Sequence, residues 1–363
     1  MKQQPIDLAI VGAGPAGSVC ACSARATDRN LSVALIDRET FPRDKSCGDA
    51  IREDAITMLI ELGMGHVFSG RSQIHRLQST VPEKFGYIKK LVDFDKYSYS
   101  IVERKILDHS IYQYAVDQGA QNLAGYALSD AAFDENARLW TLKLEGRSGS
   151  PLVLQTKVLV GADGASSRVR RIAGLELNSE RYMAVGIRAY ARVQGVDEGL
   201  MRVDFLKHLI PGYGWLFPLR DDKANIGVVL DQRDYKSYGN ALKSHLEYYM
   251  RYLADIGIVL EEVHSIKTHP LPLSWSELPI TPCRQVALIG DAAAMIDPFT
   301  GEGIHFGIWA GIHLGKSVAE SLNKHDLQGG IKDYAKAYHD KHADFMANSQ
   351  HFRTTIRFQR IML

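Results

Sequence analysis

The chain has 363 residues, of which 45% are hydrophobic and 23% charged, and its 43 basic residues nearly balance 42 acidic ones. This length predicts two domains, or one domain with a large insertion, and the near-zero net charge excludes the broad basic field of a nucleic-acid-binding protein. The sequence contains no run of about 18 apolar residues, which a transmembrane helix would need. It also lacks the spacing of cysteine and histidine that would predict a metal site. The four cysteines, Cys20, Cys22, Cys47 and Cys283, are typical of a reducing compartment, so we expect a cytoplasmic protein.

Residues 6–37 predict a dinucleotide-binding unit. The apolar strand IDLAIV leads into GAGPAG at residues 12–17, and an alanine-rich helix and a second strand ending at Asp37 follow. The glycines permit a tight turn, a close approach to a pyrophosphate and close packing of the helix, whose N-terminus attracts phosphate. The strand-end acid would bind the adenosine ribose and repel a 2′-phosphate, which favours FAD or NAD over NADP. The cofactor contacts predicted here are Gly12, Gly14, Pro15, Ala16, Gly17, Asp37 and Arg38.

A second apolar strand with an acidic end lies in the middle of the chain. VLVGADG at residues 158–164 stops at small residues and an acid, as the first unit does. We predict Asp163 and Gly164 as cofactor contacts. The next residues begin a helix that Ser166 or Ser167 can cap.

The following segment predicts an antiparallel sheet. Residues 182–193 and 202–206 alternate between apolar and polar with period two. YGWLFPL and NIGVVL flank the polar turn RDDKA, which predicts a hairpin. Such a sheet would cover the cofactor and place three aromatic residues on one face, namely Tyr213, Trp215 and Phe217.

A third apolar strand, at residues 285–291, ends in Gly-Asp and opens the stretch GDAAAMIDPFTGEGIHFG. A proline stiffens the loop after it, two glycines let the loop run close to a flat ligand, and a new helix points its N-terminus at that place. A helix N-terminus stabilises negative charge on a reduced flavin. NAD alone would need no third site, whereas FAD spans adenine, pyrophosphate, ribityl chain and ring, so we predict FAD. The contacts predicted here are Gly290, Asp291, Pro298, Gly301, Gly303 and Ile304.

The C-terminal segment HFRTTIRFQRIML interleaves three arginines with apolar residues. An ordinary amphipathic helix or a frayed tail accounts for this pattern. The sharper interpretation is a segment that contacts a membrane or a lipid substrate, which would make the protein peripheral at a membrane.

The order of these motifs resembles that of flavoproteins with the p-hydroxybenzoate hydroxylase fold. That family carries an N-terminal GxGxxG, a middle DG and a late GD, which here are residues 12–17, 163–164 and 290–291. Residues 102–120 also resemble the family's helix, in which Arg104 would reach the FAD. The resemblance implies that Asp291 binds the ribityl hydroxyls. It also implies an α/β fold, in which a Rossmann-type FAD-binding domain with a parallel sheet joins an antiparallel-sheet substrate domain.

Three local signatures are most similar to the geranylgeranyl reductase family: FPRDKSCGDA at residues 41–50, PGYGWLFPL at residues 211–219, and the stretch after the third strand. This resemblance implies an FAD-dependent oxidoreductase that transfers hydride to a carbon–carbon double bond of an apolar, isoprenoid-type substrate, with the three aromatic residues as a substrate wall. An FAD-dependent monooxygenase is the alternative, and a flavin-binding protein without net redox turnover is a third. The chain has no second GxGxxG unit, so the reductant would be transiently bound NAD(P)H or a separate electron carrier.

The resemblance places the 41–50 loop near the flavin ring, which adds Arg43, Cys47 and Gly48 to the predicted cofactor contacts. Cys47 could donate a proton or contact substrate, or could be a small buried apolar residue. Asp49 could orient substrate or water, or could be a surface acid. His305 could act near the flavin, or could cap its helix. The predicted catalytic residues are Cys47, Asp49 and His305.

The motifs also predict a discontinuous domain organisation. The FAD-binding domain would comprise residues 1–80, 101–175 and 276–325. The substrate domain would comprise an excursion at residues 81–100 and the main segment at residues 176–275. Residues 326–363 would form a C-terminal helical tail.

Overall fold

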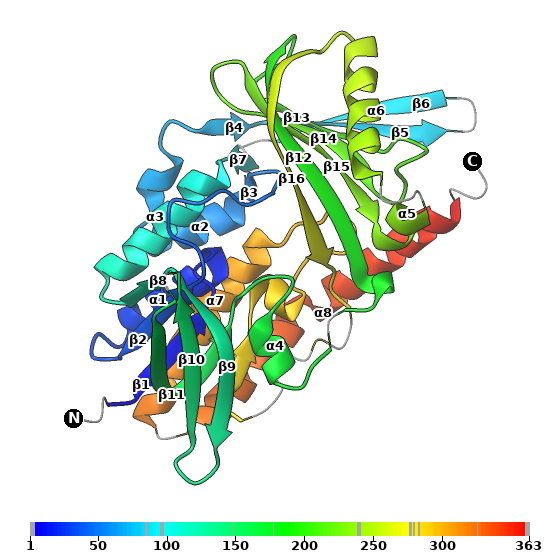
Figure 1. Ribbon diagram of the computed structural model, residues 1–363. Helices are drawn as coiled ribbons and strands as arrows, with labels where there is room; N and C mark the ends of the chain where they lie inside the picture. Colours follow the sequence, from blue (N-terminus) through cyan, green and yellow to red (C-terminus); the bar gives the residue numbers. More distant parts are fainter. Residues whose placement is uncertain are drawn as a thin grey trace.

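The computed structural model shows two lobes, each built around a seven-stranded sheet, and a smaller three-stranded sheet beside them (Figure 1). A long C-terminal helix, α8 (Leu327–Gln359), extends from the first lobe along the second. The residues that the structure describes are 4–83, 86–94, 98–147, 149–176, 178–237, 241–275, 278, 280–281, 284–324 and 326–359.

The first sheet contains the three apolar strands that the sequence predicts. Its order is β8-β2-β1-β11-β10-β9, and β17 also pairs with β11. Strands β8, β2, β1, β11 and β17 run parallel, whereas β10 and β9 pair antiparallel. Strands β1, β2 and β17 are apolar because the core covers both faces of this part of the sheet, whereas β8 at the edge begins with the exposed polar residues Gln121 and Asn122. Their bounds are β1 (Ile6–Val11), β2 (Val33–Asp37), β8 (Gln121–Ala124), β9 (Tyr126–Asp134), β10 (Leu139–Gly146), β11 (Pro151–Gly161) and β17 (Val286–Leu288).

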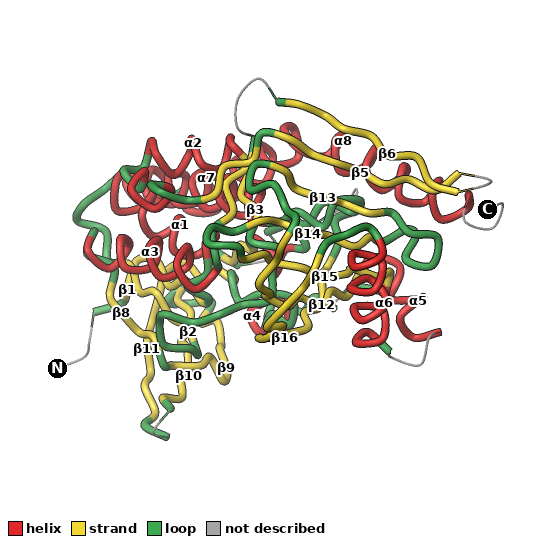
Figure 2. Tube along the Cα trace, turned by 90° about the horizontal axis from the view of Figure 1, so that it is seen from above, coloured by secondary structure: helices red, strands yellow, loops and turns green. Residues whose placement is uncertain are grey.

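Helices α1 (Pro15–Thr27), α3 (Arg104–Asp117) and α7 (Ile304–Asn323) lie on one side of these strands (Figure 2). Helices α1 and α7 touch through their backbones. A Cβ added to Gly311 would lie 2.5 Å from the carbonyl oxygen of Ala16, and one added to Gly315 would lie 2.4 Å from that of Cys20. Helix α7, which follows the late motif, therefore packs directly against the N-terminal helix α1.

The second sheet has the order β16-β12-β15-β14-β13-β5-β6 and is antiparallel except where β13 pairs with β5. Strands β14 and β15 form the hairpin predicted from the sequence. Helices α5 (Gln232–Ser237) and α6 (Leu242–Asp255) pack on this lobe. The strand bounds are β5 (Arg76–Glu83), β6 (Gly86–Asp93), β12 (Met183–Gln194), β13 (Leu200–Asp204), β14 (Tyr213–Pro218), β15 (Lys223–Asp231) and β16 (Val259–Pro272).

The remaining elements connect the two lobes. A small sheet has the order β3-β7-β4, and helix α2 contacts both this sheet and α7. Helix α4 follows β11 and begins at Ser167, whose hydroxyl accepts from the Arg170 N–H at 2.9 Å and so provides the predicted cap. The bounds are β3 (Ala50–Arg52), α2 (Glu53–Glu61), η1 (Gly65–Phe68), β4 (Ser72–Ile74), β7 (Tyr99–Ile101), α4 (Arg168–Ile172), η2 (Glu180–Tyr182) and η3 (Gly290–Ala293).

The arginines near the C-terminus face the protein. Buried Arg353 donates to Asp231 at 2.6 Å, and Arg357 lies 2.9 Å from Asp234 and 3.1 Å from Asp231. Their counter-charges lie at the end of β15 and in α5, so these two arginines pair within the protein, and the membrane contact of the segment as a whole stays a prediction. Residues 360–363, which belong to the same predicted segment, lie outside the described residues. Within the described part of the chain, no helix has the length and apolar character needed to cross a membrane.

The predicted domain boundaries remain a prediction, and most of them fall between elements. The boundary at residue 326 falls between α7 and α8, and the boundary at residue 176 precedes β12. The boundary at residue 80 falls inside β5, whose residues 76–83 already belong to the second sheet. The sequence places this boundary late because β5 has no sharp change in composition at its start.

Candidate cofactor cleft and active site

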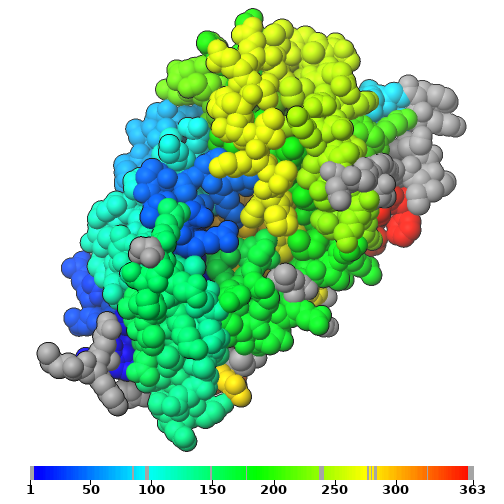
Figure 3. Space-filling model, in the orientation of Figure 1, coloured from blue at the N-terminus to red at the C-terminus, as the bar shows by residue number. Residues whose placement is uncertain are grey.

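A cleft of about 1150 Å³ opens where the parallel strands of the first sheet meet β16 of the second. In Figure 3 the surface is hollowed where the blue N-terminal segments meet the green and yellow segments. The cleft is larger than most small-molecule sites, as a dinucleotide requires. It is lined by most of the predicted cofactor contacts: Gly12, Gly14, Pro15, Ala16, Asp37, Arg38, Arg43, Arg104, Asp163, Gly164, Gly290, Asp291, Gly303 and Ile304.

The phosphate-binding turn has the geometry expected of its glycines. Gly12 has a φ of +103°, and a Cβ there would lie 2.1 Å from the carbonyl oxygen of Ala162. Gly17 packs inside the turn, where a Cβ would lie 1.9 Å from the Gly12 carbonyl oxygen. No side chain that the structure describes caps the N-terminus of α1 or of α7. Both helix ends therefore leave backbone N–H groups available to phosphate and flavin oxygens.

Two predicted carboxylates in the cleft already accept backbone hydrogen bonds. Asp37 accepts from the Ala13 N–H and the Glu39 N–H, each at 2.8 Å. Asp163 accepts from the first turn of α4, through the Arg168 N–H at 2.6 Å and the Val169 N–H at 3.1 Å. Asp163 thus fixes the helix beside the cleft, and Asp37 fixes the phosphate-binding turn.

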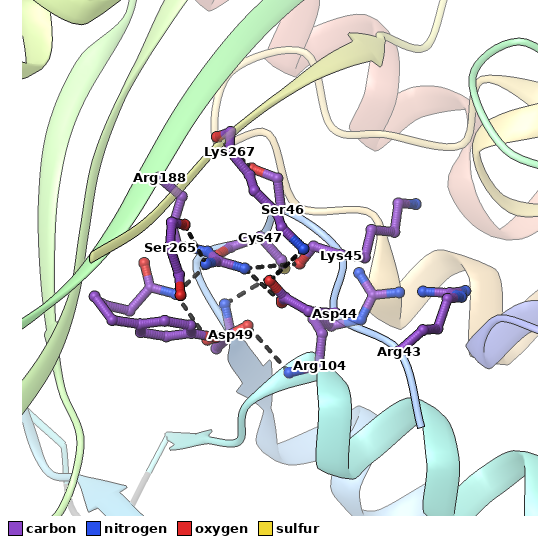
Figure 4. Close-up of polar contacts among 12 residues, drawn as sticks. Arg43, Asp44, Lys45, Ser46, Cys47, Asp49, Arg104, Arg188, Ser265 and Lys267 are labelled. Atoms are coloured by element: carbon purple, nitrogen blue, oxygen red, sulfur yellow. Dashed lines mark hydrogen bonds and ion pairs between the residues drawn. The ribbon is translucent and has the colours of Figure 1, made fainter. Parts of the chain in front are cut away.

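Two arginines share one buried carboxylate at the side of the cleft. Arg104 donates two hydrogen bonds to Asp108, of 2.6 and 2.7 Å. The Arg43 guanidinium lies 2.9 Å from the same carboxylate. A Cβ on Gly14 would lie 3.5 Å from Arg43 Nη2, so this cation stands next to the phosphate-binding turn. Arg43 and Arg104 come from the 41–50 loop and from α3, and Figure 4 shows them side by side.

The late-motif acid pairs with two basic groups. Lys45 Nζ lies 2.8 Å from Asp291 Oδ2, and His269 Nε2 lies 3.6 Å from the same oxygen. Burial alone would raise the pKa of Asp291, but Lys45 and His269 outweigh it and hold the pKa well below its usual range. The sequence indicates only an exposed or structural role for His269, yet this residue lines the cleft. No local motif surrounds it, so its place follows from the pairing of β16 with β12.

The 41–50 loop is held by a network around buried Asp49, which has a φ of +66°. The Tyr190 hydroxyl donates to Asp49 at 2.6 Å and the Asn225 amide donates to it at 2.7 Å. The same amide donates to the Cys47 carbonyl at 2.7 Å and accepts from the Trp215 indole N–H at 2.9 Å. Burial raises the pKa of Asp49 to about 6. The sequence does not indicate Tyr190 or Asn225, which lie on the second sheet.

Buried Arg188 holds the same loop from the other side (Figure 4). Its guanidinium donates to Asp44 at 2.6 Å, to the Lys45 carbonyl at 3.2 Å and to the Ser265 carbonyl at 3.0 Å. Lys267 lies 2.8 Å from Asp44 as well. The loop that carries Cys47 is therefore fixed to the second sheet by charge as well as by the Asp49 network.

Cys47 lies between these two sets of contacts and is a free thiol. The Asp49 N–H donates to its sulfur at 3.4 Å, and burial raises the pKa of the thiol, so Cys47 carries its proton at neutral pH. Cys20 and Cys22 are free and buried in α1, and Cys283 lies outside the described residues. Among the described residues, no group of three or more metal-ligating side chains comes together.

The predicted aromatic wall stands between two loops. Ring centroids are 6.4 Å apart for Tyr213 and Trp215 and 6.3 Å apart for Trp215 and Phe217. At one end a Cβ on Gly48 would lie 2.8 Å from the Phe217 ring, and at the other a Cβ on Gly301 would lie 3.6 Å from the Tyr213 hydroxyl. That hydroxyl donates to the Thr300 carbonyl. Gly48 and Gly301 therefore lie in the loops at the wall, and neither they nor Pro298 line the cleft.

The loop formed by Gly301, Glu302 and Gly303 contributes the Glu302 carboxyl group to the site. Glu302 lies 3.5 Å from Arg52 Nη1, and Arg52 also binds Asp54. Burial raises the pKa of Glu302 to about 7. His305 Nδ1 lies 3.0 Å from Asp54, so the imidazole predicted as catalytic points at a partly exposed acid outside the cleft. Arg52 is therefore the charged partner of Glu302, and the sequence alone does not identify it.

Comparisons with known proteins agree with this arrangement. The family model described as "FAD binding domain" matches residues 6–349. Menaquinone reductase of Mycolicibacterium smegmatis is 30% identical over 345 residues, which cover 92% of this chain and 79% of that protein. Digeranylgeranylglycerophospholipid reductase 1 of Methanococcoides burtonii is 26% identical over 96% of this chain and 83% of its own.

A solved structure extends the likeness to the fold. The geranylgeranyl bacteriochlorophyll reductase-like protein of Thermoplasma acidophilum superposes with a TM-score of 0.85 and 20% sequence identity. The superposition covers 97% of this chain and 88% of that one. The cradle at Gly12 and Gly14, the two uncapped helix ends and the size of the cleft fit FAD.

Proposed function

This chain belongs to the FAD binding domain family and is an FAD-dependent oxidoreductase, and from that premise we propose that it reduces carbon–carbon double bonds of an apolar, isoprenoid-type substrate. The observation that carries the proposal is the wall of Tyr213, Trp215 and Phe217, which stands between the Cys47 loop and the Glu302 loop. The quinone and the geranylgeranyl lipid in the relatives' names are both apolar, which supports an aromatic wall as the substrate surface.

The chain's own residues would hold the cofactor and the substrate in place. We assign the phosphates to Gly12, Gly14 and Arg43, the ribose to Asp37 and the ribityl chain to Asp291. When bound and reduced, FAD supplies hydride. The aromatic wall excludes water and brings the double bond close, since hydride transfer requires the reacting atoms within about 3.5 Å.

The reduction also needs a proton, and two protonated groups lie at the two ends of the wall. The Cys47 thiol is one, because burial raises its pKa, and the Glu302 carboxyl is the other, because burial raises its pKa to about 7. Asp49 accepts hydrogen bonds from Tyr190, Asn225 and the Arg104 N–H, so we assign it the positioning of the Cys47 loop instead. We assign His305 the ion pair with Asp54 in place of the catalytic role predicted from the sequence.

The reductant and the location follow from the same chemistry. We propose NAD(P)H or a separate electron carrier as the source of electrons, since one dinucleotide-binding unit is present and FAD takes it. We propose a cytoplasmic protein that works at a membrane surface, because an apolar substrate of this kind resides in the bilayer.

Product mass distinguishes reduction from oxygenation. The FAD-loaded protein, reduced with dithionite without air, is expected to convert geranylgeraniol to products heavier by two hydrogens for each double bond reduced. The measurement is mass spectrometry of anaerobic and aerated samples. A gain of one oxygen, seen only in air, would establish the monooxygenase alternative and reject the proposal. If the protein keeps its flavin but consumes no reductant with any substrate, the result would favour a flavin-binding protein without net redox turnover.

The role of Glu302 predicts a pH dependence. The reduction rate is expected to fall as the pH rises through about 7, because the carboxyl loses the proton that it donates. Arg52, Asp54, Asp297 and Tyr99 are the charged and titratable groups that face it. Glu302→Gln is expected to remove this limb and to lower the rate by about 10²- to 10⁴-fold.

Anaerobic product formation at a series of pH values tests this prediction. Glu262→Gln, at an exposed position on β16, is the control and is expected to leave the profile unchanged. A Glu302→Gln enzyme that keeps the neutral limb would assign the limb to another group.

A further inference from the structure

Strand β6 exposes an unusual number of apolar side chains. They are exposed on both faces of the strand, with exposed fractions of 45% for Tyr87, 39% for Ile88, 54% for Leu91 and 48% for Val92. Soluble surfaces rarely gather four large apolar side chains on one short strand. This exposure at the edge of the second sheet therefore indicates a surface that meets another apolar phase.

The strand also carries positive charge in the middle of its apolar residues. Exposed Lys89 and Lys90 lie between Ile88 and Leu91. The acidic Asp93 lies at the strand end, opposite Arg76 of β5. A pair of lysines flanked by apolar side chains suits an anionic bilayer, where the apolar groups enter the interface and the ammonium groups reach the headgroups.

The end of α8 continues this surface. Figures 1 and 2 both place the β5–β6 hairpin beside the C-terminal end of α8. Three phenylalanines among the described residues of that helix are exposed, and two of them lie near its C-terminal end, Phe352 by 50% and Phe358 by 65%. The exposed apolar side chains of two separate elements therefore gather at one end of the second lobe.

A row of aromatic rings connects this end of the molecule with the aromatic wall. Tyr213 lies 5.6 Å from Phe205, Phe205 stacks on Phe299 at 5.5 Å, and Phe299 meets Phe352 at 4.7 Å, measured between ring centroids. The row starts at the wall and ends at an exposed ring on α8. The four rings themselves carry no charge, and a carboxylate next to them, Asp297, accepts from the Phe299 N–H at 3.0 Å.

A second copy of the chain is a poorer partner for β6. If two β6 strands paired antiparallel over their full length, Lys89 of one would lie opposite Lys90 of the other, because residues 86 and 93 would pair at the ends. Like charges directly opposite each other destabilise a strand pair. The lysines thus protect this edge from self-association, whereas a negatively charged surface would attract them.

We propose that the β5–β6 hairpin and the exposed end of α8 dock this protein on an anionic lipid bilayer, with the aromatic row as the path of an apolar substrate to the wall. The docking surface stands on exposure and charge, while the path rests on the proposed function. The α8 part of this surface lies in the C-terminal segment, where Phe352 and Phe358 are exposed while Arg353 and Arg357 pair with Asp231 and Asp234.

Flotation of the FAD-loaded protein with lipid vesicles tests the docking. The protein is expected to float with phosphatidylcholine vesicles that contain phosphatidylglycerol, and less with phosphatidylcholine alone or at high salt. The Ile88→Ser/Leu91→Ser variant is expected to lose about tenfold or more in affinity, because each side chain gives up apolar burial. Lys89→Glu/Lys90→Glu is expected to lose only the preference for anionic vesicles.

The controls separate docking from folding and from turnover. Val153→Ser removes an equally exposed apolar side chain at the far lobe and is expected to bind as wild type does. Reduction of geranylgeraniol in vesicles is expected to slow in the Ile88→Ser/Leu91→Ser variant, with reduction of water-soluble geraniol unchanged. Equal flotation of this variant and wild type, or a dimer in solution that the variant abolishes, would overturn the proposal. Flotation without any alkene reduction would keep the docking and reject the proposed function.

Discussion

Replacing Asp231 with alanine is expected to lower the free energy of unfolding by about 3–5 kcal/mol. Asp231 is buried at the end of β15 and lies within 3.1 Å of three arginines, Arg233, Arg353 and Arg357. Without it, buried Arg353 keeps its charge and loses its carboxylate, which costs more than the ion pair contributes. The loss would release the end of α8 from the second lobe.

Thermal and denaturant unfolding of the FAD-loaded protein measure this effect. Asp130→Ala is the matched control, because Asp130 forms an exposed pair with Lys143 and its removal is expected to leave the unfolding midpoint nearly unchanged. If the two variants unfold at the same midpoint, the cluster at Asp231 is not what fastens α8.

The same cluster predicts a loss of stability in acid. Burial alone would raise the pKa of Asp231, but the three arginines outweigh it and lower the pKa. A carboxyl with a lowered folded-state pKa stabilises the fold above its unfolded pKa of about 3.9. That contribution is lost as the pH falls through the lower folded-state value, so wild type is expected to lose more stability in acid than Asp231→Ala.

Replacing Asp291 with alanine is expected to weaken FAD binding by about tenfold to a hundredfold, the value of a hydrogen bond to a charged group. Asp291 lines the cleft from the late motif, and its pairs with Lys45 and His269 keep it charged. The substitution removes the acceptor assigned to the ribityl hydroxyls. It also leaves Lys45 and His269 without their carboxylate.

Titration of the deflavinated protein with FAD, followed by flavin fluorescence, gives the dissociation constant. Asp291→Asn keeps an acceptor oxygen and is expected to bind better than Asp291→Ala. Asp197→Ala removes an exposed acid from the second lobe and serves as the control. Unchanged FAD affinity in Asp291→Ala would place the ribityl chain elsewhere.

The sequence predicts those parts of the site whose chemistry is local. The strand that ends in glycines and the helix after it are contiguous, so Gly12, Gly14 and Asp37 can be assigned to one cleft from the order of the residues alone. The hairpin of β14 and β15 is equally local, since its two strands flank one turn.

Partners that are distant in the sequence could not be predicted. Asp49 is 141 residues from Tyr190 and 176 residues from Asn225, and the chain has no local pattern that joins them. The C-terminal arginines illustrate the same limit, because their partners are also distant in the sequence. An amphipathic segment with arginines fits a lipid surface or an acidic protein surface equally well, and only the folded structure shows that Arg353 and Arg357 find their partner in Asp231.

The contact of α1 with α7 sets the order in which the cofactor site can form during synthesis. The Ser23 hydroxyl donates to the Ile312 carbonyl, 289 residues further along the chain. Because a protein leaves the ribosome N-terminus first, α1 waits for nearly the whole chain before its partner helix exists. Strand β17 and the Asp291 loop are also made late. The nascent chain therefore cannot assemble this cleft around FAD until α7 has been made.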